Sequence, residues 1–373
     1  MGVTQRFHDL MSNRHQYARE WKEKRGGKVV GYLCGYVPEE VLYAAGILPV
    51  RILGSHEPQD LTEAHIFNMY CPFCRDCLAQ GLQGRYEYLD GITTGHSCMH
   101  MRQTFDSWVK HLPVSYNHYL YVPAHVQSVH AQSLLREELG YFKQSVEEWT
   151  GKPISNEALD RAIDVYNTNR RLLKQVYELR KSDPPSISGV EAMEIVLTSM
   201  FVDKEEHNQL LRQALAELPQ QGSGPGSQIR LMFVGSANDD IEFTRMTEEL
   251  GSYVVIEDHC TGSRYFWSEV VPQDDRLTAI AASYINKPAC PQKDLVERTR
   301  FPYLLGLARD YNVQAAVVIQ QKFCDPHEFD IPPIRALLEG NGIPVLFLEF
   351  DLTVPLGQFR TRVEAFFEML QTV

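Results

Sequence analysis

The sequence predicts an α/β protein with two doubly wound parallel-sheet domains, flavodoxin-like or Rossmann-like, and a helical region between them. Short apolar runs alternate with helix-like stretches in each half of the chain, a pattern typical of parallel sheets. Between the two alternations, apolar residues recur at helical spacing, and a glycine-rich segment then precedes the second alternation. The expected divisions are residues 1–130 for the first α/β domain, 131–219 for the helical region, 220–228 for a linker and 229–373 for the second α/β domain.

The first domain is expected to start with a strand, a helix and a strand. A proline followed by two glutamates marks the helix start, because proline suits the first turn and the carboxylates complement the helix dipole. A glycine, which tolerates the left-handed conformation, marks its end. Two more apolar runs follow further along the chain. In order, the expected elements are strand Val29–Cys34, helix Pro38–Gly46, and strands Ile47–Leu53, Tyr88–Thr94 and His118–Val122.

The region from about Ala131 to Leu218 is expected to be almost entirely helical. Ser155 is expected to cap its second helix, which should stop near Pro184 and Pro185. Apolar stripes at helical spacing usually form protein core, so we assign no cofactor contact to the stripe of the first helix. That stripe consists of Leu135, Leu139, Phe142, Val146 and Trp149.

Four short apolar runs in the last third of the chain predict the strands of a second parallel sheet. They are Arg230–Ser236, Tyr253–Glu257, Ala315–Gln320 and Pro344–Phe350, and the stretches between them are mostly helix-like. In doubly wound domains, ligands bind beyond the carboxyl ends of the strands. The side chains expected at that edge are Ser236, His259, Cys260, Cys324 and Asp351.

The composition argues against several classes of function. The formal net charge of -12 disfavours nonspecific binding to nucleic acid, which depends on clustered lysine and arginine. No run of about 20 apolar residues predicts a membrane span. The polar start, Met1 to Glu20, does not resemble a signal peptide. We therefore expect a cytoplasmic protein that binds neither nucleic acid nor membrane.

Cysteines in a chain expected to stay in a reducing compartment indicate metal ligation rather than disulfides, and the sequence contains eight. The densest group is Cys71, Cys74 and Cys77, followed by Cys98. The first three have the spacing of a bacterial ferredoxin run, but the fourth cysteine of that run is absent, so a self-contained ferredoxin site is disfavoured. A structural zinc site stays open, because two histidines stand nearby and zinc accepts cysteine and histidine ligands.

Four stretches of the chain together resemble the family of 2-hydroxyacyl-CoA dehydratase D-components and benzoyl-CoA reductases. They are Gly31–Arg51, the run around Cys71, Leu89–Cys98, and Gln321–His327 with Gly342–Asp351. Within this family, three stretches are most similar to the smaller, C-type substrate-binding subunit of the ATP-dependent, class I reductases. These are Cys71–Cys77, Gln103–Trp108 and His259–Trp267.

The resemblance implies a [4Fe-4S] cluster held by Cys71 and Cys98 of the first domain and Cys324 of the second, with one iron open toward the substrate. Cys74 and Cys77 are possible additional ligands, although packing beside the cluster is the simpler interpretation. A helix N-terminus beside Cys71 or Cys98 would favour the thiolate form that binds metal.

The other cysteines carry weaker expectations. Cys34 ends the first expected strand and would face the cleft if the fold is as inferred. Cys260 and Cys290 are as consistent with small buried residues as with functional ones, because free cysteine packs like a small apolar side chain.

Histidines and arginines supply the remaining candidates. His96 and His259 are candidate proton donors, with His100 a further one, because imidazole titrates near neutral pH. A loop histidine is, however, more often a hydrogen-bonded structural group. Bidentate contacts to CoA phosphates are conceivable for Arg51, Arg75, Arg102 and Arg264, although most arginines on such a surface are simply solvated.

The resemblance further implies an ATP-dependent benzoyl-CoA reductase, which dearomatises benzoyl-CoA to a cyclic diene thioester by low-potential single-electron transfer. The chain lacks a G-x-x-x-x-G-K-[ST] run, so MgATP must be hydrolysed by another protein. The implied partners are a larger homologous subunit, ATP-hydrolysing iron–sulfur activator subunits and a low-potential donor such as ferredoxin. Two alternatives stay open: a 2-hydroxyacyl-CoA dehydratase subunit, which eliminates water by radical chemistry, and a noncatalytic structural or electron-transfer subunit.

Overall fold

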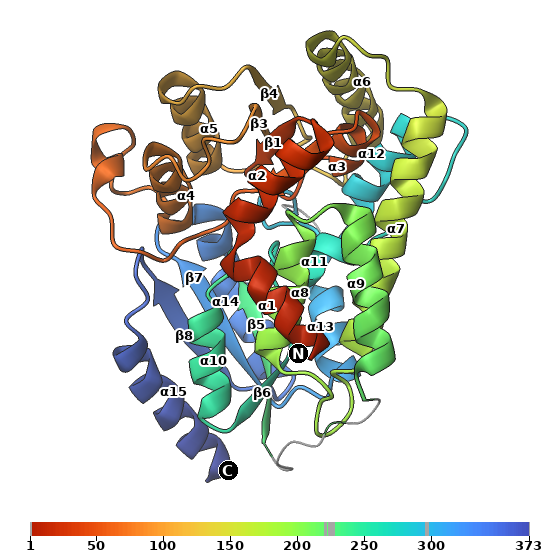
Figure 1. The fold of residues 1–373 in the computed structure, drawn as a ribbon. Helices are drawn as coiled ribbons and strands as arrows, with labels where there is room; N and C mark the ends of the chain where they lie inside the picture. The colour runs from red at the N-terminus through yellow and green to blue at the C-terminus, as the bar shows by residue number, and fades with distance from the viewer. Residues whose placement is uncertain (1, 220–221, 223–227, 295–297, 373) are drawn as a thin grey trace.

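Two parallel sheets surrounded by helices form the part of the chain that the structure describes (Figure 1). The structure is a computed structural model, and it describes residues 2–219, 222, 228–294 and 298–372. Each sheet has four strands among these residues, in the order β2-β1-β3-β4 for the first and β6-β5-β7-β8 for the second. Doubly wound folds of the flavodoxin kind share this order. The predicted α/β fold class with two doubly wound sheets is confirmed.

The first sheet contains β1 (Val29–Tyr32), β2 (Leu48–Arg51), β3 (Gly91–Gly95) and β4 (Tyr116–Leu120), in parallel pairings. Helix α3 (Glu39–Ala44) joins β1 to β2, as predicted. The third and fourth strands lie two or three residues from the starts that the sequence predicted. Helices α4 (Pro72–Leu82) and α5 (Met99–His111) follow β2 and β3, and the short helix η1 (Leu61–Ala64) precedes α4.

The middle region is helical, as predicted. Its described helices are α6 (Ala131–Thr150), α7 (Asn156–Glu178), α8 (Gly189–Ser199) and α9 (Lys204–Glu217). Helix α6 buries the predicted apolar stripe except Trp149, which is partly exposed. The side chain of Ser155 caps α7 by accepting a hydrogen bond from the backbone of Ala158, and α7 ends ahead of Pro184. The predicted linker, 220–228, lies outside the described residues except for 222 and 228.

The second sheet contains β5 (Ile229–Gly235), β6 (Ser252–Asp258), β7 (Ala315–Gln321) and β8 (Val345–Phe350), again in parallel pairings. These bounds match the predicted runs to within one residue. One face packs against α10 (Ile241–Glu249) and α15 (Leu356–Gln371), at the lower left of Figure 1. The other face shares a core with α13 (Arg300–Asp310) and α14 (Asp325–Gly340). Along the chain, the helices α11 (Ser263–Phe266) and α12 (Arg276–Asn286) follow β6 and precede α13.

Two N-terminal helices, α1 (Val3–Ser12) and α2 (Arg14–Arg25), are absent from the sequence prediction. The segment is polar overall, but Val3, Phe7 and Met11 repeat every four residues and are buried on one face of α1. Helix α1 packs on α8, and α12 of the second half packs on α6 of the middle region. Segments distant in sequence thus cover one another, and the predicted domain boundaries stay a prediction. None of the described helices combines the length and apolar character needed to cross a membrane.

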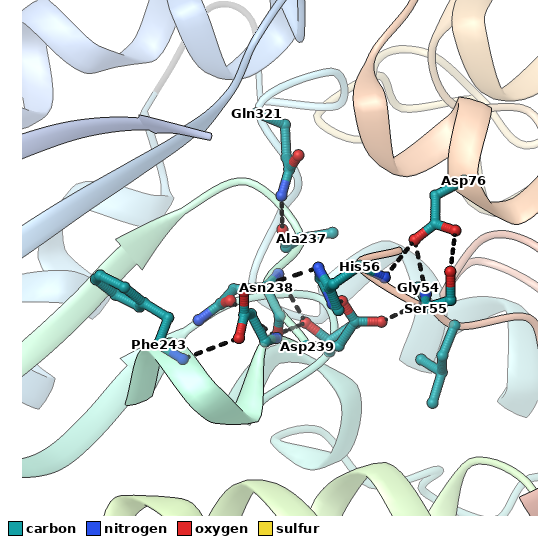
Figure 2. Close-up of polar contacts among 12 residues, drawn as sticks. Gly54, Ser55, His56, Asp76, Ala237, Asn238, Asp239, Phe243 and Gln321 are labelled. Carbon is teal, nitrogen blue, oxygen red and sulfur yellow. Dashed lines mark hydrogen bonds and ion pairs between the residues drawn. The ribbon is translucent and has the colours of Figure 1, made fainter. Parts of the chain in front are cut away.

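A set of loop contacts joins the carboxyl edges of the two sheets (Figure 2). We call it the latch and define it as Gly54, Ser55, His56, Asp76 and Asp239. The backbone of Gly54 donates to Asp239 at 2.6 Å. The backbone N–H groups of Ser55 and His56 donate to Asp76 at 2.6 and 2.9 Å. Because residues 54–56 follow β2 and Asp239 follows β5, the latch holds the carboxyl ends of these two strands beside each other.

Candidate functional site

A cavity of about 100 Å³ lies where the carboxyl ends of strands from both sheets meet. Its walls include residues that follow β1, β3, β5, β6 and β7. Doubly wound folds bind their ligands at this edge. Seven of the eight cysteines line the cavity: Cys34, Cys71, Cys74, Cys98, Cys260, Cys290 and Cys324.

Four of these cysteines form what we call the first thiol set: Cys71, Cys74, Cys98 and Cys324. Three of them are helix N-caps, because Cys71 precedes α4, Cys98 precedes α5 and Cys324 precedes α14. At a helix N-terminus, unpaired backbone N–H groups and the positive end of the dipole lie close to the capping side chain. The Cys98 sulfur accepts a hydrogen bond from the backbone N–H of Met101 at 3.4 Å. This local structure favours thiolates, the form that binds metal.

The sulfurs of the first thiol set also contact one another. Hydrogen bonds from the thiols of Cys324 and Cys74 hold the pKa of Cys71 well below its ordinary value, although burial opposes them. A hydrogen bond from Cys74 lowers the pKa of Cys98, with help from backbone N–H groups of α5. The same contacts raise the pKa of Cys74 and that of Cys324, which act as donors. These contacts therefore favour the thiolate form of Cys71 and Cys98 over that of Cys74 and Cys324.

The backbone just before Cys324 is held in an uncommon conformation. Phe323 has a φ of 61°, in the left-handed region that bulky side chains avoid. The backbone N–H of Cys324 donates to the carbonyl of Gln321 at 2.9 Å, which closes the turn between β7 and α14. Strain of this kind persists where the surrounding structure fixes it, most often at functional sites. Here it accompanies the turn that brings a sulfur to the cavity.

Cys74 and Cys77, one turn apart in α4, have different surroundings. Cys74 lines the cavity and hydrogen-bonds with Cys71 and Cys98. Cys77 is fully buried, is not among the described lining residues, and has its sulfur 3.6 Å from the carbonyl oxygen of Ile52. Whether either binds metal stays a prediction, but Cys74 has access to the cavity and Cys77 does not.

The other three lining cysteines, Cys34, Cys260 and Cys290, form what we call the second thiol set. Cations accompany them. Arg51 donates to the backbone carbonyl of Cys260 at 2.9 Å and to its sulfur at 3.2 Å. Lys287 lines the same cavity, and burial lowers its pKa to about 8. The cavity therefore has a second group of thiols, in a cationic environment that the sequence did not reveal.

The first thiol set suits an iron–sulfur cluster. Thiolate sulfur is the ligand that iron–sulfur clusters take, and three sulfurs reach the cavity from three separate helix N-termini. The three sulfurs come from elements that follow strands of both sheets. With only three protein ligands, one coordination position of a cluster would stay open toward a substrate. Separately, the described residues contain no group of three or more His, Cys, Asp or Glu placed to hold a single metal ion.

The sequence matches a known family along nearly its whole length. The family described as 2-hydroxyglutaryl-CoA dehydratase, D-component, matches residues 34–370. The chain belongs to this family. The matched range includes every cysteine of both thiol sets.

Relatives of this chain have names that span two activities. It is 25% identical to the (R)-phenyllactyl-CoA dehydratase beta subunit of Clostridium sporogenes, over 98% of this chain and 97% of that one. It is 26% identical to the C subunit of benzoyl-CoA reductase from Thauera aromatica, over 92% and 90%. It is also 26% identical to the beta subunit of (R)-2-hydroxyglutaryl-CoA dehydratase from Acidaminococcus fermentans, over 93% of each chain. These identities do not separate the dehydratases from the reductase.

The two predicted proton donors, His96 and His259, are not among the described residues that line the cavity. The Nδ1 of His96 lies 2.7 Å from the hydroxyl of Tyr119, and burial lowers the pKa of this histidine. His259 is fully buried, and neither ring nitrogen has a hydrogen-bond partner among the described residues. Burial lowers the pKa of His259 to about 4. A neutral imidazole is a weak acid, so these surroundings favour neither His96 nor His259 as a proton donor. Both roles stay predictions.

The four arginines considered for CoA phosphates occupy different environments. Arg51 and Arg264 are buried and line the cavity. Arg75 is also buried, but it donates to the backbone carbonyl of Asn68. Arg102 is about half exposed, with 49% of its side chain accessible. Contact with CoA stays a prediction for all four, and only the first two reach the cavity.

The sequence analysis did not single out Tyr265, and it named His100 without its contact to Cys71. Tyr265 lines the cavity, and its hydroxyl accepts a hydrogen bond from Lys204 at 2.8 Å and donates one to Glu39 at 3.1 Å. The Nδ1 of His100 accepts a hydrogen bond from the backbone N–H of Cys71 at 3.1 Å. No local pattern marks these contacts, because each joins elements far apart in the sequence. The family motifs signalled the cysteines alone.

Proposed function

We propose that this chain is the smaller substrate-binding subunit of an ATP-dependent benzoyl-CoA reductase, and that Cys71, Cys98 and Cys324 hold its [4Fe-4S] cluster. One observation carries the proposal: these cysteines cap three helices and line a single cavity at the carboxyl edges of both sheets. Family membership supports the class of reaction, since a relative of similar length is named as the C subunit of a benzoyl-CoA reductase.

The cavity walls suit a flat, apolar ring. When bound, the cluster would supply single electrons at low potential, which reduction of an aromatic ring requires. Phe73, Met101, Pro288 and Pro326 of this chain give the cavity apolar walls. Such walls exclude water and strengthen the electrostatic interactions inside. The thioester carbonyl of the substrate assists, because it delocalises charge added to the ring.

Ring reduction also consumes protons, and a buried hydrogen-bond chain leads to the cavity. Tyr265 lies at the cavity wall between Lys204 and Glu39. Burial lowers the pKa of Lys204 to about 8 and raises the pKa of Glu39. Both groups can therefore exchange protons closer to neutral pH than their solvated forms do. We propose this chain as a proton source beside the two histidines expected from the sequence, His96 and His259.

The enzyme we propose has several components. The relatives named above are beta or C subunits. We infer that this chain likewise works with a larger homologous subunit, an ATP-hydrolysing iron–sulfur activator and a low-potential donor such as ferredoxin. The activator is required because the chain has no G-x-x-x-x-G-K-[ST] run in which to bind the phosphates of ATP.

A 2-hydroxyacyl-CoA dehydratase subunit is the second candidate. Relatives named as phenyllactyl-CoA and hydroxyglutaryl-CoA dehydratase subunits match the chain as well as the reductase does. Such an enzyme would use the same cavity to eliminate water from a hydroxyacyl thioester. A noncatalytic partner subunit is less well supported, because all three proposed ligands are present at one cavity.

Substrate turnover separates these candidates. The chain is combined under strict anaerobiosis with its larger partner, the activator, reduced ferredoxin and MgATP, and is given either benzoyl-CoA or a 2-hydroxyacyl-CoA. We expect loss of the aromatic absorbance of benzoyl-CoA. Water elimination from the hydroxyacyl thioester, with the aromatic absorbance unchanged, would assign the chain to the dehydratases. Cys98→Ser should abolish turnover of either substrate.

A further inference from the structure

We propose that the second thiol set, Cys34, Cys260 and Cys290, is a second metal site that binds its own iron–sulfur unit in the same cavity as the first thiol set. The site is separate from the cluster ligands proposed above and does not depend on which thioester the enzyme uses. The number of sulfurs is the first argument. Three thiolates hold the proposed cluster, yet seven cysteines line one cavity.

The second thiol set is assembled from three distant segments. Cys34 follows β1, Cys260 follows β6 and Cys290 follows α12. Two of these segments are tied together, because Lys287 donates from Nζ to the carbonyl of Gly35 at 2.5 Å. All three cysteines line the same cavity.

The lining around these sulfurs is positively charged. Arg51, Arg264 and Lys287 line the cavity, and none of its described lining residues carries a carboxylate. Arg51 and Arg264 are only 2% and 4% exposed. Arg264 pairs with Asp258, but neither Arg51 nor Lys287 has a carboxylate partner among the described residues, and burying an unpaired cation is costly. Iron–sulfur units held by thiolates are anionic, so a unit bound at the second thiol set would offset that cost.

Two of these guanidinium groups retain unpaired N–H groups. The Nε of Arg51 and the Nη1 of Arg264 have no hydrogen-bond partner within the described part of the chain. The Nη2 of Arg264 donates to the carbonyl of Gly235 at 3.1 Å, and its Nε lies 3.2 Å from a carboxylate oxygen of Asp258. Buried polar groups without partners are uncommon and require an explanation. An anionic, sulfur-rich ligand in the cavity would accept these hydrogen bonds.

Arg51 contacts a sulfur of the second thiol set directly. Its Nη2 donates to the sulfur of Cys260 at 3.2 Å. A charged donor directed at sulfur stabilises the thiolate, and hydrogen bonds to sulfur help set the potential of iron–sulfur sites.

Cys77 illustrates a cysteine of this chain that only packs. It is 0% exposed, lies off the cavity and has its sulfur 3.6 Å from the carbonyl oxygen of Ile52. The second thiol set differs in each respect, since its members are partly exposed, line the cavity and lie among cations. Packing accounts for Cys77 but not for the charge and exposure around the second thiol set.

Metal analysis of the full chain tests the proposal. Wild type, the triple variant Cys34→Ser/Cys260→Ser/Cys290→Ser and the matched control Cys77→Ser are purified and reconstituted with iron and sulfide under anaerobic conditions. The triple variant should contain about half the iron and sulfide of wild type, because one of two units is lost, whereas the control should retain all of it. Equal contents in wild type and the triple variant would overturn the proposal. So would zinc without sulfide in wild type.

Alkylation of the wild-type chain gives a readout that does not depend on folding of the triple variant. Iodoacetamide should leave the second thiol set unmodified in the loaded protein and modify it after the iron is chelated, as peptide mass spectrometry can measure. Modification of these thiols in loaded protein, while the first thiol set stays protected, would reject the second site. Cys98→Ser separates this result from the proposed function, because it should lower iron while the second thiol set remains protected.

Discussion

The Nε2 of His56 lies 2.8 Å from Oδ1 of Asp239, across the junction between the two sheets (Figure 2). His56 has a φ of 58°, which is uncommon for a residue other than glycine. Burial lowers the pKa of His56, but Asp239, Asp240 and Asp76 outweigh burial and raise it to about 9. At neutral pH the imidazolium therefore pairs with carboxylates on the other side of the junction, and the latch holds the strand edges that build the cavity.

Removing this imidazolium should destabilise the fold in a pH-dependent way. Because the pKa of His56 rises from 6.5 to about 9 on folding, its contribution is fully present below about 6.5 and is lost as the pH rises through 9. At neutral pH or below, His56→Ala should cost up to about 3 kcal/mol of unfolding free energy, and the difference from wild type should shrink by pH 10. Urea unfolding at several pH values measures it. His130→Ala, at an exposed position, is the control.

A difference between wild type and His56→Ala that stays constant from pH 6 to pH 10 would contradict the assignment of charge to His56. Asp239, the carboxylate partner of His56, should give a stability contribution with the opposite pH dependence. Burial raises the pKa of Asp239, but His56 and the hydrogen bonds to it outweigh burial and lower it overall. The contribution of Asp239 is therefore present above its unfolded pKa and is lost as the pH falls through its folded value.

The cysteines of α4 and α5 should differ in their effect on metal content. Cys98→Ser should lose most of the iron of the first thiol set, because Cys98 caps α5 and lines the cavity. Cys74→Ser and Cys77→Ser should lose less, and Cys77→Ser least, since Cys77 is buried away from the cavity. Iron and acid-labile sulfide per chain, measured anaerobically, test this order. Equal loss in all three variants would favour a ferredoxin-like arrangement of the Cys71 run.

The strands could be predicted from the sequence because their signal is local. β5 and β7 are mostly apolar runs bounded by helix-like stretches, and both were placed to within one residue. Helix α1 was missed for the opposite reason: its apolar positions, Val3, Phe7 and Met11, are few in a polar segment and gain meaning only against α8. Local patterning thus defines elements that are buried all round and misses those buried along one narrow stripe.

The candidate site was likewise predictable from the sequence only in part. Cys71, Cys98 and Cys324 could be named from short motifs, and the structure brings them to one cavity. The second thiol set could not be recognised as a group, because Cys34 and Cys260 lie in separate family-like stretches and Cys290 lies in none of them. Their convergence results from tertiary packing around buried arginines, which spacing along the chain does not encode.

A buried ion pair between α3 and α7 should be important for stability. Arg170 of α7 pairs with Glu40 of α3, which is 0% exposed and also accepts a hydrogen bond from Tyr284 at 3.2 Å. Arg170→Met would leave the carboxylate buried without its cation, which costs about 3–5 kcal/mol. The matched control Arg171→Met removes a half-exposed arginine that pairs with Glu269 and should cost less than about 1 kcal/mol. Thermal and urea unfolding measure both, and similar costs would show that Glu40 does not depend on Arg170.

Ring reduction should require every component of the proposed enzyme. In the proposed enzyme this chain would contribute three thiolate ligands and part of a pocket, but its sequence has no G-x-x-x-x-G-K-[ST] run with which to couple ATP hydrolysis to an energetically unfavourable electron transfer. The chain alone, or the chain with its larger partner, should therefore leave the absorbance of benzoyl-CoA unchanged. Adding the activator, a low-potential donor and MgATP should start its decay, and replacing ATP with a nonhydrolysable analogue should stop it. Controls without each component, recorded anaerobically at equal protein concentration, assign the requirement. Reduction by this chain without ATP would reject the energetic argument, because the electron transfer would then need no coupling.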